Sequence, residues 1–302
     1  MKKNNRREFL KSGSIATSLL ALAPIGLGAG KSLLKVKVPN STNQIQVLHS
    51  AGLKGQIEPL DSIGGLRSIQ ELRVEKSAAS IYLDSGNFLT KDVGFERNLA
   101  FLRNLVSSGL TLATLGKQEM EFPSNELQKL IQESKVKILG NNLEGNGLIL
   151  GETYFTRAII TSGKYRVGVL PVSGASLGSL TSKALELKLF YQCDLVVALG
   201  NPSGMSFSEA KNYFGHSHQI DHFLVDDEFF MPLGTRVVHS KKGKEIWVSR
   251  PADLGRFVGN FQYQFNSAYE ICQLSNHSCI PGKASNPQKM AFLHQFSAQN
   301  LV

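Results

Sequence analysis

The 302-residue sequence contains only three cysteines, and after its first thirty residues it has no long apolar run. Three cysteines allow at most one disulfide bond within the chain. No later segment reaches the roughly 18 to 20 apolar residues that a membrane-spanning helix needs, which excludes a polytopic membrane protein. Internal repeats and low-complexity tracts are also absent. Hydrophobic residues nevertheless make up 42% of the chain and charged residues 19%. We therefore expect a chain that folds around a substantial core.

The net charge of +9 is concentrated at the N-terminus. The first eleven residues hold five basic side chains and one acidic side chain, so they contribute +4 and leave +5 for the other residues. A mildly basic surface of this kind is ordinary. Charge therefore gives no reason to expect a nucleic-acid partner.

The N-terminal segment has the pattern of an export signal. Arg6 and Arg7 are followed by Glu, Phe, Leu and Lys, and a charge-free stretch rich in Ala, Leu and Gly then runs from residue 12 to residue 30. The pattern resembles the twin-arginine consensus, which implies a periplasmic or exported protein. We assign residues 1–30 to this signal and 31–44 to a linker, and expect membrane contact only through an uncleaved signal.

Short apolar strands alternate with helical segments through the body of the chain. The continuous apolar run 195–199 is typical of a buried strand, and the leucines of 98–108 have helical spacing. This alternation predicts a single α/β domain over residues 45–266, with helices on both faces of a sheet. Residues 267–302 lose the alternation, so we expect a loosely structured or helical tail there.

Ligands of such sheets bind beyond the carboxyl ends of the strands. The loops that begin after residues 49, 83, 115, 199 and 225 are therefore the candidate site.

These loops resemble, in order, the motifs of the calcineurin-like metallophosphoesterases, and in particular the catalytic domain of the 5′-nucleotidase group. The resemblance covers roughly residues 45–265 and rests on LHSAGLKGQIEP at 48–59, GGLR at 64–67, YLDSGN at 82–87, TLGKQEME at 114–121, VVALGNPSG at 196–204 and DLGRFVG at 253–259. It implies a β-sandwich flanked by helices. It also implies family chemistry in which two metal ions polarise a phosphate and activate a water.

The residues at the family's metal-site positions depart from the family in this chain. The resemblance places the opening Asp and His on Gly52 and Lys54, the bridging Asp on Asn87, the Asn and His of the third motif on Lys117 and Gln118, the next His on Asn201, and the last His pair on Asp227 and Phe229. None of them keeps the family residue. A neutral amide bridges two dications poorly, and a lysine near a metal position repels the cation by roughly several kcal/mol. Asp84 and Glu119 lie beside these positions, and we expect them to be structural or to form salt bridges.

Two hypotheses follow. In the first, the chain is an exported binding or scaffold protein that has lost the dinuclear site, needs no cofactor and is not an enzyme. Its ligand is then a protein partner or a phosphate-like anion, the latter in a metal-free pocket formed by Lys54 and Lys117. In the second, the chain is an active phosphoric ester hydrolase in which Asn87, Asn201 and Asp227 hold one divalent metal such as Mn, Zn or Fe.

Two further patterns leave alternatives open. Cys272 and Cys279 are the only close cysteine pair, and they either close a small C-terminal loop by a disulfide or stay free. His216 and His218 belong to a GHxH sequence that the family has at its last ligand pair. Because a helical stretch rather than a strand precedes them, we interpret this match as a coincidence. Cys193 precedes an apolar run and is expected to be buried.

Overall fold

A computed structural model describes residues 33–40, 43–76, 80–141, 143, 147–202, 207–226 and 233–299 of the chain. The expected signal with Arg6 and Arg7 lies outside the described residues, as do the loop positions Asp227 and Phe229. Within these ranges, no helix has both the length and the apolar character needed to cross a membrane.

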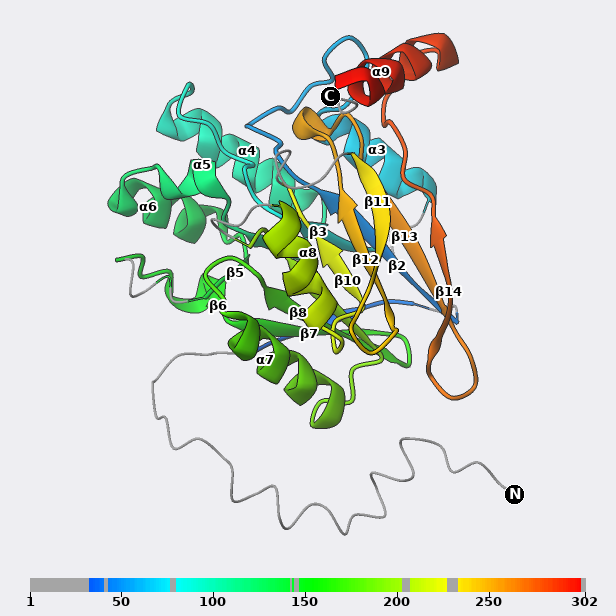
Figure 1. Ribbon diagram of the computed structural model, residues 1–302. Coiled ribbons are helices and arrows are strands. Elements are labelled where there is room, and N and C mark those ends of the chain that lie inside the picture. Colours follow the sequence, from blue (N-terminus) through cyan, green and yellow to red (C-terminus); the bar gives the residue numbers. More distant parts are fainter. Residues whose placement is uncertain are drawn as a thin grey trace, which may run out of the picture.

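Two seven-stranded sheets pack face to face at the centre of the molecule (Figure 1). The first sheet has the order β1 (Leu33–Val38), β7 (Arg157–Ser162), β8 (Tyr165–Pro171), β9 (Leu195–Leu199), β10 (His222–Leu224), β12 (Glu245–Arg250) and β11 (Gly234–His239). The second has the order β14 (Ile271–Asn276), β13 (Gly259–Phe265), β2 (Gln44–Ser50), β3 (Ile81–Asp84), β4 (Leu112–Thr114), β5 (Ile138–Leu139) and β6 (Tyr154–Phe155). Strands β8, β9 and β10 run parallel, and so do β2, β3 and β4. The loops that follow them therefore gather at one end of each sheet.

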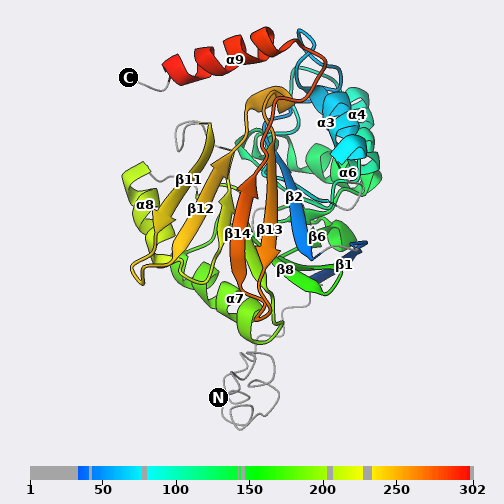
Figure 2. The same cartoon turned by 90° about the vertical axis from the view of Figure 1, so that its right-hand side faces the viewer.

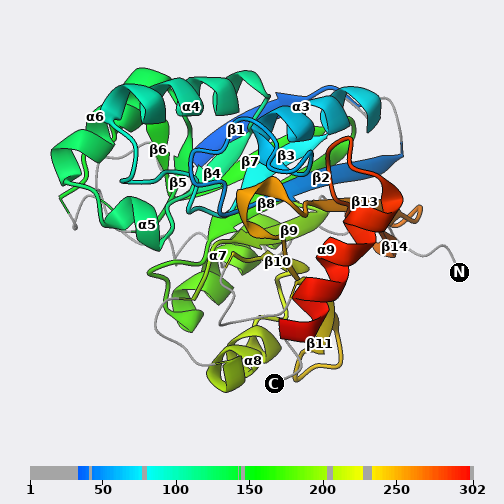
Figure 3. The same cartoon turned by 90° about the horizontal axis from the view of Figure 1, so that it is seen from above.

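Helices cover the outer face of each sheet, as the view from above shows (Figure 3). The second sheet carries α3 (Gly65–Lys76), α4 (Phe95–Ser107) and α6 (Ser124–Ser134), and the first sheet carries α7 (Leu177–Leu189) and α8 (Phe207–His216). The remaining helical segments are α5 (Lys117–Met120), α9 (Asn286–Gln299) and the 3-10 turns Gly151–Thr153 and Asp253–Gly255. Helix α9 packs through Phe292 against a small separate apolar cluster that includes Ile63 and Ile280.

The two-sided packing explains why central strands are apolar throughout. In β9, Leu195, Val197 and Leu199 face the other sheet, whereas Val196 and Ala198 face the helices. A strand buried on both faces has a continuous hydrophobic sequence and not an alternating one. The prediction of a buried strand at 195–199 is confirmed at those bounds.

The ends of the chain differ from the expectations. Residues 33–38, expected as linker, form β1, which pairs in parallel with β7. Residues 267–302 were expected as a loosely structured or helical tail; residues 271–276 instead form β14, which pairs antiparallel with β13, and Asn286–Gln299 form the helix α9. Figure 2 shows β14 and β13 beside the hairpin of β11 and β12. An edge strand is only half buried, so its sequence carries little apolar periodicity, and that is why β14 was missed.

Of the two alternatives left open for Cys272 and Cys279, the structure has the free thiols, because β14 (Ile271–Asn276) takes up most of the segment between them. An extended chain rises about 3.3 Å per residue, which places the two Cα atoms roughly 20 Å apart, whereas a disulfide needs about 4.4 to 6.8 Å. Both thiols are free. Cys193 is free and buried, as predicted.

Candidate functional site

The candidate site lies where the loops after β2, β3, β4, β9 and β10 meet at one end of the sheets (Figure 1); we call it the loop end. Backbone hydrogen bonds join the first two loops. The amide of Gly52 donates to the carbonyl of Gly86 at 2.8 Å, and the amide of Lys54 donates to the carbonyl of Asn87 at 3.1 Å. The positions that the family motifs single out in these two loops are therefore neighbours in space.

Glu119 ties the loop after β3 to the loop after β4. Its buried carboxylate accepts hydrogen bonds from the backbone N–H groups of Asn87 at 2.7 Å, Leu89 at 2.8 Å and Gly116 at 2.8 Å. Burial raises the pKa of Glu119, and the backbone donors oppose part of that rise. These contacts give Glu119 the structural role that the sequence predicts.

Asp84 is fully buried at the end of β3. Its carboxyl group accepts a hydrogen bond from the Ser50 hydroxyl at 2.5 Å and one from the amide of Gly86 at 2.8 Å. Burial raises the pKa of Asp84 to about 8, so the group holds its proton at neutral pH. Burial also lowers the pKa of nearby His49 well below its usual value. Neither group therefore adds charge to the loop end at neutral pH.

A carboxylate lies between the two asparagines at metal-site positions. The amide nitrogen of Asn87 donates to Asp226 Oδ2 at 2.6 Å, and the amide nitrogen of Asn201 donates to Asp226 Oδ1. The side-chain oxygen of Asn87 accepts from the backbone N–H of Gln118 at 2.9 Å, and that of Asn201 accepts from the backbone N–H of Asp226 at 3.0 Å. Because backbone N–H groups bind both amide oxygens, the two NH₂ groups must face the carboxylate. Asp226 is only 6% exposed.

A second carboxylate fills the space beside Gly52. An added Cβ atom at Gly52 would lie 2.5 Å from Asp253 Oδ1, so Asp253 occupies the place where a side chain at position 52 would begin. Asp253 Oδ2 in turn forms an ion pair with Lys54 Nζ at 2.5 Å. The space beside Gly52 is therefore taken by Asp253, whose charge Lys54 neutralises.

The third-motif positions Lys117 and Gln118 lie on α5. Lys117 is exposed, and within the described part of the chain its ammonium group makes no hydrogen bond or ion pair. Gln118 binds Asn87 through its backbone, whereas its buried side-chain oxygen has no hydrogen-bond partner among the described residues. The structure thus brings Asn87, Gln118 and Asn201 into one network.

Reasoning from the sequence missed Asp226 and Asp253. Asp226 directly precedes Asp227, on which the motif frame placed a ligand, and Asp253 begins the last matching segment. The available signal was that Asp226 stands next to a motif position that departs from the family pattern. Only the fold shows that these carboxylates reach the loop end.

The histidines of the GHxH sequence belong elsewhere. His216 is the last residue of α8, and its Nδ1 lies 2.7 Å from the carbonyl oxygen of Asn212. His218 Nε2 lies 3.1 Å from Lys242 Nζ. The interpretation of this match as a coincidence agrees with these contacts. Across the ranges that the structure describes, no three His, Cys, Asp or Glu side chains are grouped to hold a metal ion.

The sequence matches no protein-family model and no curated protein. Its structure is similar to a 5′-nucleotidase precursor from Thermus thermophilus (TM-score 0.64, 16% identity, 85% of this chain and 59% of that one). It is also similar to the NAD nucleotidase NadN of Haemophilus influenzae (TM-score 0.66, 13% identity, 85% and 56%). A third similar structure is the sulfate thiohydrolase SoxB of Thermus thermophilus (TM-score 0.53, 13% identity, 90% and 61%).

The chain has the metallophosphoesterase fold of these structures. Two mixed sheets flanked by helices are common to them, as the family resemblance implied. The single sheet with helices on both faces that the strand–helix alternation predicted is wrong, because each sheet packs its inner face against the other sheet and carries helices on its outer face alone. The chain spans somewhat more than half the length of the structures that it resembles. At these identities the likeness shows the fold alone, so activity has to be argued from the loop end itself.

Proposed function

We propose that this chain is an exported binding or scaffold protein that keeps the metallophosphoesterase fold without a dinuclear metal site and without catalysis. The nucleotidase and thiohydrolase activities named for its structural neighbours are then absent from it. The observation that carries the proposal is the position of Asp226 between the amide groups of Asn87 and Asn201.

In this network N–H donors point at a central anion, whereas in a metal centre oxygen acceptors point at a central cation. A divalent cation needs oxygen lone pairs directed at it from several sides. Here the two amide groups direct hydrogen atoms at a carboxylate, and their oxygens are engaged by backbone N–H donors. A cation placed between Asn87 and Asn201 would face N–H hydrogens unless both amide groups turned over and left those backbone donors unpaired. Such unpaired donors cost about 1 to 3 kcal/mol each when buried.

The ion pair between Lys54 and Asp253 supports the same proposal. Asp253 is the residue nearest to a Cβ atom placed at Gly52, and Lys54 Nζ neutralises it at 2.5 Å. A cation there would compete with an ammonium group that is already bound. The same contact also weakens the version in which Lys54 and Lys117 together hold a phosphate-like anion, because only Lys117 has a free charge.

Metal content and turnover test the proposal directly. The full chain, purified from the periplasm, is analysed for Mn, Zn and Fe and then assayed with bis-p-nitrophenyl phosphate in the presence of each metal. We expect neither stoichiometric metal nor turnover. We also expect no rise of the unfolding temperature when Mn²⁺ is added, because a ligand that binds only the folded state must stabilise it.

One equivalent of metal with turnover would overturn the proposal and support the mononuclear hydrolase with Asn87, Asn201 and Asp227 as ligands, whereas two equivalents with turnover would overturn it in favour of a dinuclear centre. The matched controls are Asn87→Ala, which must abolish such turnover, and Asn43→Ala, which changes an asparagine far from the loop end. Turnover that survives Asn87→Ala would come from a contaminating hydrolase, and the proposal would stand.

Export is tested separately. We expect a reporter fused to residues 1–35 to reach the periplasm, and we expect replacement of both Arg6 and Arg7 by Lys to prevent it. Unchanged export of the double variant would refute the twin-arginine assignment without touching the proposal about the loop end.

A further inference from the structure

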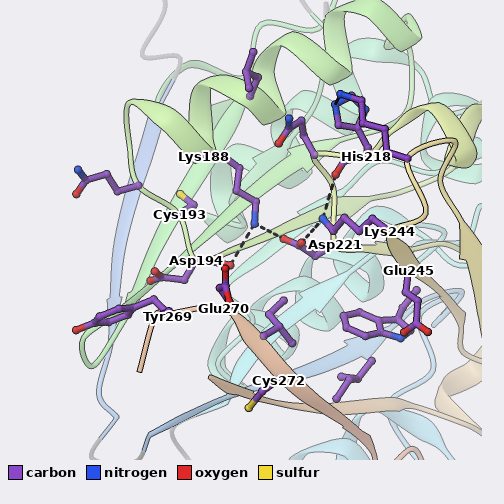
Figure 4. A pocket seen from close by; sticks show the side chains of 18 of the residues that line it. Lys188, Cys193, Asp194, His218, Asp221, Lys244, Glu245, Tyr269, Glu270 and Cys272 are labelled. Carbon is purple, nitrogen blue, oxygen red and sulfur yellow. Dashed lines mark hydrogen bonds and ion pairs between the residues drawn. The ribbon is translucent and has the colours of Figure 1, made fainter. Parts of the chain in front are cut away.

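A hollow of about 930 Å³ opens at the opposite end of the sheets from the loop end. It is bordered by the C-terminal half of α7, by the turn between β11 and β12, and by the start of β14 (Figure 4). Asp194 and Asp221 line it and precede β9 and β10, whereas Asn201 and Asp226 follow those strands. The length of β9 separates the two regions by roughly 17 Å. We call this hollow the lower pocket.

Around Asp221 the floor of the lower pocket carries more positive than negative charge, whereas the lining as a whole has three lysines and the four carboxylates of Asp194, Asp221, Glu245 and Glu270. Asp221, whose side chain is 5% exposed, lies between Lys188 Nζ at 2.6 Å and Lys244 Nζ at 2.5 Å (Figure 4). Burial alone would raise the pKa of Asp221, but the two ammonium groups outweigh burial and lower it, so the carboxylate stays ionised. Two ammonium groups around one carboxylate leave one positive charge in excess.

The lysines differ in how many donors remain. Lys244 Nζ uses its three N–H groups on Asp221 and on the carbonyl oxygens of His218 and Ile220. Lys188 Nζ donates to Asp221 and to the carbonyl of Asp194, which leaves one N–H group. Lys242 on the rim contacts only His218 Nε2 among the described residues, which leaves two N–H groups. Lys188 and Lys242 can therefore bind an added acceptor without losing a contact.

The walls of the lower pocket are apolar and partly open to solvent. Trp247 and Leu274 are half-buried, and Leu185 and Leu189 of α7 are 40% and 42% exposed. Covering apolar surface of this kind yields roughly 25 cal/mol per Å². The walls can therefore stabilise an apolar body that lies against them.

We propose that the lower pocket binds a small amphiphilic anion, with its anionic group at Lys188 and Lys242 and its apolar body against Trp247 and the α7 leucines. A concave hollow with apolar walls and a few polar groups is the usual form of a small-molecule site. The carboxylates of Asp194 and Glu270 lie on the side away from His218, and that of Glu245 lies on the side of Lys244 (Figure 4); these acidic side chains disfavour a second anionic group in the pocket. The proposal goes beyond the loss of the metal site and does not depend on it.

Trp247 provides a local reporter, because it is the single tryptophan of the chain. The full-length protein is titrated with the anionic dye 1-anilinonaphthalene-8-sulfonate and with its neutral parent 1-anilinonaphthalene. We expect one molecule of the anionic dye per chain, energy transfer from Trp247 to the dye, and an affinity at least about tenfold above that of the neutral parent. Near-ultraviolet circular dichroism must stay unchanged, since this dye also binds loosely packed states.

Two pairs of neighbouring residues supply matched variants. Lys242 lines the pocket and Lys241, exposed on the same turn, does not. Lys242→Ala should weaken binding of the anionic dye about fivefold and leave the neutral parent unaffected, whereas Lys241→Ala should change neither. Leu189→Asp should weaken both dyes about tenfold or more, and Phe190→Asp, next to it but outside the lining, should not.

Equal affinity for the two dyes would overturn the anion recognition. Absence of energy transfer from Trp247, or equal effects of the paired variants, would overturn the location. If the protein shows this dye-binding pattern and also hydrolyses the phosphodiester, the proposed function is refuted and the proposal of anion binding in the lower pocket is not.

Discussion

Replacement of Asp84 by Asn should remove a specific part of the pH dependence of stability. The folded-state pKa of Asp84 is about 8, against an ordinary value of 3.8. A carboxyl group whose pKa is raised by folding contributes its full stability below the ordinary pKa, and loses it as the pH rises through the folded-state pKa. The wild-type protein should therefore become less stable with rising pH at the alkaline end.

The size of the effect follows from the two pKa values. Over each pH unit in which the Asp84 carboxyl is ionised in the unfolded chain but protonated in the folded chain, the free energy of unfolding falls by about 1.4 kcal/mol. From about pH 7 to about pH 9, the loss due to Asp84 is roughly 1 to 2 kcal/mol, because the folded group itself ionises near the middle of that range. Histidines have largely lost their protons in the unfolded chain by this range, so they interfere little.

The assay is urea unfolding followed by the fluorescence of Trp247, at constant ionic strength and at several pH values in this range. In Asp84→Asn the amide retains an acceptor for the Gly86 N–H and a donor for the Ser50 hydroxyl, so the fold should persist. The variant should gain about 1 to 2 kcal/mol relative to wild type between the ends of the range. Glu71→Gln, on the exposed face of α3, should follow wild type. Parallel curves for wild type and Asp84→Asn would refute the reasoning.

Three other substitutions test the packing of the site and core. Asp226→Ala removes the acceptor of two charge-assisted hydrogen bonds and should lower the free energy of unfolding by about 2 to 4 kcal/mol in urea titrations. A change under about half a kcal/mol would show that the network does not stabilise the fold. Gly52→Ala should lower the free energy of unfolding by about 2 to 3 kcal/mol, because residue 52 has φ +60° and the new Cβ atom would lie 2.5 Å from Asp253 Oδ1. This loss should be smaller when Asp253→Ala is also present, and an equal loss would show that the two positions are independent. Burial lowers the pKa of His222 to about 3. Between that pH and about 6.5, the unfolded chain therefore binds one proton more than the folded chain, so acidification destabilises the fold. From about pH 6 to about pH 4, the free energy of unfolding should fall by about 2 to 3 kcal/mol more in wild type than in His222→Gln. Equal acid sensitivity of both proteins, measured by the same titration, would contradict that reading.

The Asp226 network also joins the two sheets. Asn87 follows β3 of the second sheet, whereas Asn201 and Asp226 follow β9 and β10 of the first. Hydrogen bonds from two amide groups to one carboxylate therefore hold loops of the two sheets together.

Most of the fold could be predicted from the amino-acid order alone. Central strands such as Leu195–Leu199 are recognisable because burial on both faces demands an unbroken apolar run. The edge strands β1 and β14 are not, because half of their surface meets solvent and few apolar residues are required. The same limit applies to the cysteines, whose spacing says nothing about whether the chain between them bends.

For the loop end, the motif resemblance indicated which positions differ from the family pattern but not which side chains lie beside them. That Gly52 and Asn87 stand where the family pattern has an Asp follows from the motif order alone. The arrival of Asp253 beside Gly52 and of Asp226 beside Asn87 depends on loops that are 201 and 139 positions away in the chain. Hydrogen-bond partners are chosen by distance in space, and only the packing of two sheets brings those carboxylates within about 3 Å of their donors.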